Sequence, residues 1–140
     1  MNIQKKLLVM FFCVLAIGLS GCSTTPKAEP IAELPEGAKK IATVDMTGRD
    51  GTFTAGSFNA WNDGYMVLDI HLQSGRINTL EIVNGTTGEV VDSLKKPKRA
   101  IYDTVEHTYR SGREYNLSFI NSENLTGTID VYFVTEFPQY

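Results

Sequence analysis

Apolar and polar residues alternate along several short stretches of this 140-residue chain. The clearest stretch is Tyr65–Leu72, in which every second side chain is apolar: Met66, Leu68, Ile70 and Leu72. A period of two places these four side chains on one face of a β-strand and leaves Tyr65, Val67, Asp69 and His71 on the other. This pattern therefore predicts strands rather than amphipathic helices.

Similar stretches, separated by turn-forming residues, predict about eight strands. They are Ile41–Met46, Thr52–Phe58, Tyr65–Leu72, Ile77–Val83, Glu89–Ser93, Ile101–Tyr109, Glu114–Asn121 and Thr128–Glu136. Turns such as Asn84-Gly85 and Ser111-Gly112 lie between them, and Asn121–Gly127 is predicted to be a turn-rich connection. Many short strands without intervening helices indicate an all-β fold, which we predict to be a two-sheet antiparallel β-sandwich of the jelly-roll-like type.

The N-terminus has the order of a secretory signal. Lys5 and Lys6 precede the apolar run Leu7–Leu19, and the small residues Ser20 and Gly21 follow it. Thirteen helical residues span only about 20 Å, which is less than the roughly 30 Å of a bilayer core. The run therefore fits a signal peptide over residues 1–21 better than a permanent membrane span.

The box Leu19-Ser20-Gly21-Cys22 resembles the cleavage site of bacterial lipoproteins. The resemblance implies removal of residues 1–21 and attachment of fatty acyl chains, such as palmitate, at Cys22. It also implies a lipid anchor in the cell membrane or outer membrane, with the protein facing the periplasm or cell exterior. Ser23 differs from the Asp that tends to retain such proteins in an inner membrane. The alternative is an ordinary signal peptide followed by an unmodified Cys.

The composition after residue 21 excludes several kinds of site. Cys13 leaves with the signal and Cys22 carries the lipid, so neither of the chain's two cysteines remains for a disulfide, a zinc site or a nucleophile. Without Lys5 and Lys6, 13 − 2 = 11 basic residues face 16 acidic ones, a formal charge of −5. This charge argues against nucleic acid as a partner.

We predict that residues 22–39 combine the lipidated Cys with a flexible linker, and that residues 40–140 form one domain. The linker contains Pro26, Pro30 and Pro35 and has few apolar residues. A segment of this composition buries too little apolar surface to offset the entropy of ordering.

The segment Gly112-Arg113-Glu114-Tyr115-Asn116-Leu117-Ser118-Phe119-Ile120-Asn121 resembles a strand of GOLD-like and pre-peptidase C-terminal-like β-sandwiches. The preceding strand and the Thr87-Gly88 turn extend the resemblance over about the last 75 residues. It implies a binding or spacer module and transfers no catalytic residues.

Several polar groups admit both a chemical and a structural interpretation. Asp45, Asp50, Asp63 and Asp69 could supply oxygen ligands to Ca²⁺, but Asp also favours turns. His71 and His107 could bind zinc if their strands met. Lys95, Lys96, Lys98 and Arg99 could contact an anionic surface or could protect a sheet edge. We favour the structural interpretation of each and predict no catalytic residues, metal or cofactor.

Trp61 lies in a polar turn and is the centre of the one candidate ligand site. Asn59, Asn62, Asp63 and Tyr65 surround it in the sequence. A sugar ring could stack on the indole while amides and carboxylates bind its hydroxyl groups. Alternatively, Trp61 covers one end of the core.

These observations favour a non-enzymatic, lipid-anchored envelope protein that binds a protein partner or serves in assembly. The alternative is a carbohydrate-binding module that binds envelope glycans through Trp61. A small hydrolase has the weakest support from the sequence.

The anchor can be tested by replacing Cys22 with Ser. We expect the variant to be released from the membrane fraction, because each buried methylene of an acyl chain contributes about 0.8 kcal/mol to attachment. Immunoblotting of fractionated cells, with mass spectrometry of the N-terminus, measures both location and lipid. A Ser variant that stays in the membrane would contradict lipidation at Cys22.

Overall fold

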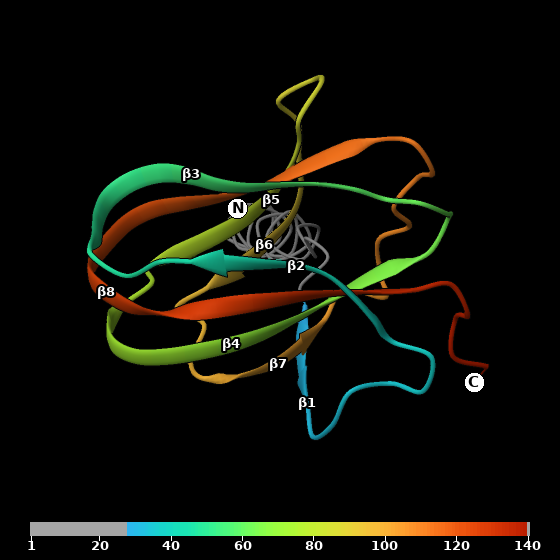
Figure 1. The fold of residues 1–140 in the computed structure, drawn as a ribbon, viewed down its shortest axis with the longest axis horizontal. Helices are drawn as coiled ribbons and strands as arrows, with labels where there is room; N and C mark the ends of the chain where they lie inside the picture. The colour runs from blue at the N-terminus through green and yellow to red at the C-terminus, as the bar shows by residue number, and fades with distance from the viewer. Residues whose placement is uncertain (1–27, 140) are drawn as a thin grey trace, which may run out of the picture.

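The structure, a computed structural model, describes residues 28–139, and all of its regular elements are β-strands. Figure 1 shows how they curl around a common interior. The strands are β1 (Glu29–Ile31), β2 (Lys39–Asp45), β3 (Arg49–Asn59), β4 (Tyr65–Arg76), β5 (Thr79–Asn84), β6 (Val90–Lys95), β7 (Ala100–Asp103) and β8 (Glu114–Val134). The predicted all-β antiparallel fold is confirmed.

The strands form two layers of a single curled sheet. One layer, called layer A below, has the order β1-β7-β4-β8-β2, and layer B has the order β3-β8-β5-β6. Every pairing is antiparallel. The sandwich that the sequence predicts is therefore continuous through β8, which belongs to both layers.

β8 is one strand of 21 residues, whereas the sequence predicted two strands separated by a turn. Its first half pairs with β3 and β5, and its second half pairs with β4 and β2. The turn-forming residues of Asn121–Gly127 lie where the strand bends from layer B into layer A (Figure 1). They bend the strand without ending it, because Thr52 and Asp50 accept the N–H groups of Asn121 and Asn124 at 3.1 and 3.0 Å.

Two asparagines preserve the inward face of β8 across this bend. Asn121 and Asn124 have φ angles of 51° and 45°, a region that Asn tolerates better than most residues. Buried residues recur at every second position up to Phe119, then at Ser122, and at every second position again from Leu125. The alternation of inward and outward side chains therefore shifts by one residue twice, once between Phe119 and Ser122 and once between Ser122 and Leu125. The second shift cancels the first, so both halves of β8 face the same core.

The main core lies between the two layers. It contains the predicted inward residues Met66, Leu68, Ile70, Leu80, Ile82, Tyr115, Leu117, Phe119, Ile129, Val131 and Phe133, all of them almost fully buried. The assignment of faces from period two is therefore confirmed for these strands. Fully burying an aliphatic side chain of this size contributes roughly 1.5–3 kcal/mol to folding.

The outer face of layer A carries a second, smaller apolar cluster. Tyr65, Val67 and Val134 are buried there, and Ile31 and Leu34 pack against them. The sequence placed Tyr65 and Val67 opposite the core, and this side is covered by a segment that we had expected to be a linker. For residues 29–31 the prediction of a flexible linker is wrong: Glu29–Ile31 forms β1 and pairs with β7.

The predicted strand Ile101–Tyr109 is shorter in the structure. β7 ends at Asp103, and Thr104 then fixes the chain to β4. The Thr104 hydroxyl donates to the carbonyl of Met66 at 2.7 Å and accepts its N–H at 3.0 Å. The Thr104 N–H also donates to the Met66 carbonyl at 3.0 Å, so the contact with β4 continues for one residue beyond β7 before residues 105–108 form a loop.

The predicted signal peptide over residues 1–21 and the lipidated Cys22 lie outside the described residues. Within residues 28–139, no helix is long and apolar enough to span a membrane.

The bend can be tested at Gly75, which has a φ of 86° and lies against the carbonyls of Glu123 and Asn124. We expect Gly75→Ala to lower the free energy of unfolding by more than about 3 kcal/mol, because a Cβ would collide with rigid backbone. Gly48→Ala is the matched control: φ is 76° but the space is open, so the expected cost is about 1–2 kcal/mol. Equal losses in chemical denaturation would contradict the close packing at Gly75.

Candidate functional site

The candidate site is a rim of two loops at one end of the sandwich. The first loop, residues 60–64, joins β3 to β4, and the second, residues 109–113, precedes β8. Four backbone hydrogen bonds tie them together: Ala60 N–H to Arg113 O at 3.0 Å, Gly112 N–H to Ala60 O at 2.8 Å, Gly64 N–H to Tyr109 O at 3.1 Å and Tyr109 N–H to Gly64 O at 2.7 Å. The rim is therefore held like a short stretch of sheet.

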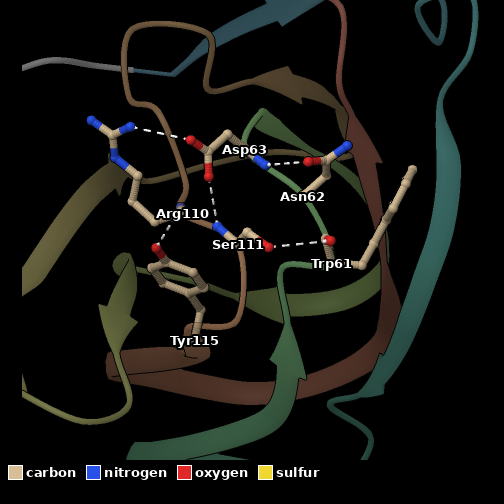
Figure 2. A network of polar contacts seen from close by, with 6 residues as sticks. All are labelled: Trp61, Asn62, Asp63, Arg110, Ser111 and Tyr115. Atoms are coloured by element: carbon tan, nitrogen blue, oxygen red, sulfur yellow. Dashed lines mark hydrogen bonds and ion pairs between the residues drawn. The ribbon is translucent and has the colours of Figure 1, made fainter.

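Asp63 joins the two loops through its carboxylate (Figure 2). Oδ1 accepts the N–H of Ser111 at 2.8 Å, and Oδ2 lies 3.3 Å from Nη1 of Arg110. The Ser111 N–H is the main reason that the pKa of Asp63 lies below its usual value, and Arg110 lowers it further. Both oxygens of this carboxylate are thus already engaged within the protein.

Trp61 is exposed on this rim, with 51% of its surface accessible. Lys39 Nζ lies over the indole at 5.3 Å from the ring centroid, within cation–π range. The buried ring of Phe133 lies 5.9 Å away at an angle of 59°. Figure 2 shows the indole on one side of the loop and the Asp63–Arg110 pair on the other. Trp61 therefore both covers the end of the core and presents aromatic surface to solvent.

Gly64 allows the first loop to lie against β8. A Cβ at this position would collide with the carbonyl of Val134 and would come within 2.8 Å of the Phe133 ring. Only glycine permits this close approach, which holds Trp61 above Phe133.

The other predicted ligand residues are distributed differently. Asn62 is exposed, and its Oδ1 accepts the N–H of Asp63 at 3.2 Å. Asn59 is exposed at the end of β3, opposite Glu114. Tyr65 is buried on the outer face of layer A and packs against Phe137, so it does not share the exposed surface of Trp61.

The sequence missed the partners of this rim. Lys39 lies in the range predicted to be linker, and Arg110, Ser111 and Phe133 lie about 50 or more positions from the first loop. The Ser111-Gly112 turn was visible in the sequence, but nothing in it indicated which loop it would contact.

A buried polar cluster lies beneath the second loop. The ring of Tyr109 packs edge-on against Tyr115 at 4.9 Å, and the Tyr115 hydroxyl accepts the N–H of Arg110 at 3.0 Å. The Tyr109 hydroxyl and Oδ2 of Asp92 are buried without a hydrogen-bond partner among the described residues. The pKa of Asp92 is raised to about 6, mainly by burial; the Ser93 N–H opposes this shift, and Glu106 contributes to it. Nothing in the sequence around Asp92 indicates that its side chain faces the interior.

The aspartates considered for Ca²⁺ have local structural partners. Asp45 and Asp50 accept backbone N–H groups of Thr47 and Asn124 at 2.9 and 3.0 Å. Asp69 lies 3.2 Å from Nε2 of His71. Within residues 28–139, no group of three or more His, Cys, Asp or Glu residues is arranged to hold a metal ion.

The two histidines occupy different surroundings. His71 lies on β4 beside Asp69 and Asp130, and Asp130 also pairs with Lys40 at 3.0 Å. His107 lies in the loop after β7 with its ring edge-on to Tyr109, and burial lowers its pKa.

The basic cluster forms the connection between β6 and β7. Lys95, Lys96, Lys98 and Arg99 are exposed, while Pro97 between them is buried. The Lys96 N–H donates to Asn78 O at 2.9 Å, and the Lys98 N–H donates to the Tyr102 hydroxyl at 2.8 Å. The backbone of the connection is thus fixed, and the four basic residues are exposed, with Lys95 Nζ 3.4 Å from the Thr79 hydroxyl oxygen.

Searches with this chain against models of protein families, characterised proteins and solved structures find no match. The resemblances to lipoproteins and to GOLD-like sandwiches stay predictions.

Asp92 provides a test of the buried cluster. Its folded pKa exceeds the ordinary 3.8, so the folded state binds a proton more tightly than the unfolded chain, and stability falls as pH rises from about 4 through 6. We expect Asp92→Asn to raise the free energy of unfolding by about 1–3 kcal/mol at pH 8, because it removes a buried charge and keeps an acceptor for the Ser93 N–H.

Denaturation at several pH values measures this effect. The advantage of Asp92→Asn should disappear near pH 4.5, where Asp92 is protonated in the folded state. Asp45→Asn is the control, because the Thr47 N–H lowers the pKa of Asp45 and the effect of pH should have the opposite sign. A gain for Asp92→Asn that does not depend on pH would contradict a buried ionised carboxylate.

Proposed function

We propose that this chain is a non-enzymatic, lipid-anchored protein of a bacterial cell envelope that binds a protein partner through the rim around Trp61. The observation that carries the proposal is a half-exposed Trp on a loop that is hydrogen-bonded to its neighbour. Trp and Arg are enriched among residues that dominate binding energy at protein interfaces. Trp61 and the exposed Arg110 both belong to this rim.

The rigidity of the rim supports binding. A surface that is already ordered loses little conformational entropy when a partner docks. The four backbone hydrogen bonds and the Asp63 bridge supply this order before binding. The lipid at Cys22, implied by the lipoprotein box, would keep the rim outside the cytoplasm and close to other envelope proteins.

A glycan ligand is the second candidate, and the exposed indole beside Asn62 favours it. Three contacts of the rim weaken this candidate relative to the first. Lys39 lies over the indole, Asp63 is engaged by the second loop, and Tyr65 is buried away from Trp61. Stacking on a sugar requires a free ring face and free polar groups around it.

The proposal can be tested with an aromatic photo-crosslinking amino acid in place of Trp61 in living cells, which keeps a ring at this position; the protein in the adduct is then measured by co-purification with chains that carry no crosslinker, with Trp61 or with Ala at position 61. We expect a discrete protein adduct at position 61 and none at position 73, an exposed control site on β4. Trp61→Ala should weaken recovery of that adduct's protein by about tenfold or more, because truncating a central Trp typically costs at least 2 kcal/mol.

The outcomes separate the two candidates. Adducts of many different masses, which a glycan-cleaving enzyme reduces to the mass of the protein alone, would support the glycan candidate and reject a protein partner. Identical adducts at positions 61 and 73, or none at either, would also reject the rim as a protein-binding surface.

A further inference from the structure

A groove of about 430 Å³ lies beside the outer face of layer A, on the opposite side of the layer from Trp61. Phe133 and Val134 are successive residues of β8, so their side chains point to opposite faces. Trp61 lies over Phe133, whereas Val134 packs with Tyr65 in the outer cluster. Tyr65 lines the groove, so this is a second surface, separate from the rim.

The walls of the groove are mainly apolar. The Tyr65 ring packs against Phe137 with 5.5 Å between centroids, and Phe137 is 40% exposed. Ile31, Ala32, Pro35 and Pro138 complete the apolar lining. The segment that the sequence assigned to a linker thus forms one wall, and the C-terminal segment forms the other.

The charges around the groove are of one sign. Glu33, Glu36, Asp103 and Glu136 line it, and a neighbouring hollow of about 330 Å³ shares Glu36 and Glu136. Within the described part of the chain, every charged residue that lines either hollow is acidic, and none of the four forms an ion pair with Lys, Arg or His. A ligand that enters therefore meets apolar walls between uncompensated carboxylates.

The apolar walls and the surrounding carboxylates together favour a ligand that has both apolar and cationic parts. Lys and Arg side chains have apolar stems that cover hydrophobic surface and cationic heads that pair with carboxylates. The exposed ring of Phe137 also attracts cations. Asp103 is partly buried, and its burial raises its pKa, so a neighbouring cation would stabilise its charged form. An acidic or purely apolar segment would leave the carboxylates unpaired.

We propose that this groove binds a basic, extended segment of a protein partner, with Lys or Arg stems against the exposed Phe137 and their cationic heads at the surrounding carboxylates. The proposal rests on the proposed protein-binding function and specifies the chemistry of one partner segment. The charge of the groove also favours fast association with a basic segment at low salt.

The test uses the full chain purified in non-ionic detergent and a fluorescent five-residue peptide of alternating lysine and alanine. Fluorescence anisotropy measures the Kd, with detergent alone as the blank. The double variant Glu33→Gln/Glu36→Gln should raise the Kd about fivefold or more, because it removes two ion pairs with the lysine side chains of the peptide. Phe137→Ala should also weaken binding, since it removes an exposed wall.

The matched control is Glu89→Gln/Glu114→Gln, which makes the same change in net charge at exposed positions outside the groove lining. We expect it to change the Kd less than twofold, and a peptide with glutamate in place of lysine should not bind. Equal weakening by the two double variants would overturn the proposal, because binding would then follow net charge alone. Absence of saturable peptide binding, or equally tight binding of lysine amide alone, would also overturn it.

The result is independent of the rim. Loss of peptide binding with retained crosslinking at position 61 rejects only the groove. Loss of crosslinking with retained peptide binding rejects only the rim.

Discussion

The backbone pairing of β8 is the constraint on which the rest of the structure depends. This strand hydrogen-bonds to β3 and β5 in one layer and to β2 and β4 in the other. Because it stays in register with all four, its inward side chains supply both halves of the core. The bend at Asn121 and Asn124 sets the angle at which the layers face each other, and so it also sets where the loops at the far end meet.

The strands and their buried faces followed from the sequence because period two is a local property. Met66 and Phe119 could be assigned to the core without knowing any partner strand. The bend in β8 could not be predicted in this way, because residues that usually end a strand here donate hydrogen bonds to Thr52 and Asp50, which lie about 70 positions away. Local sequence specifies what a segment favours, and distant contacts decide between a turn and a bulge.

The candidate site shows the same division. Trp61 stands out because an aromatic residue in a polar turn is unusual, but the sequence left open whether it faces solvent or covers the core, and in the structure it does both. The engagement of Asp63 by Ser111 could not be foreseen, since it depends on two loops that meet only after the sheet has closed. Tyr65 illustrates a third case. The alternation in β4 places it on the face opposite the core, and residues Ile31 and Leu34 of the predicted linker cover that face.

The pairing of β1 with β7 changes the distance that would separate the domain from the proposed lipid anchor. Between Cys22 and Ala28, the first described residue, there are 28 − 22 = 6 residue steps, which reach at most about 20 Å when fully extended. A free linker up to residue 39 would have allowed nearly three times that separation. With an acylated Cys22 the domain would therefore stay close to the lipid headgroups. Only partners in the same bilayer or next to its surface would then come within its reach.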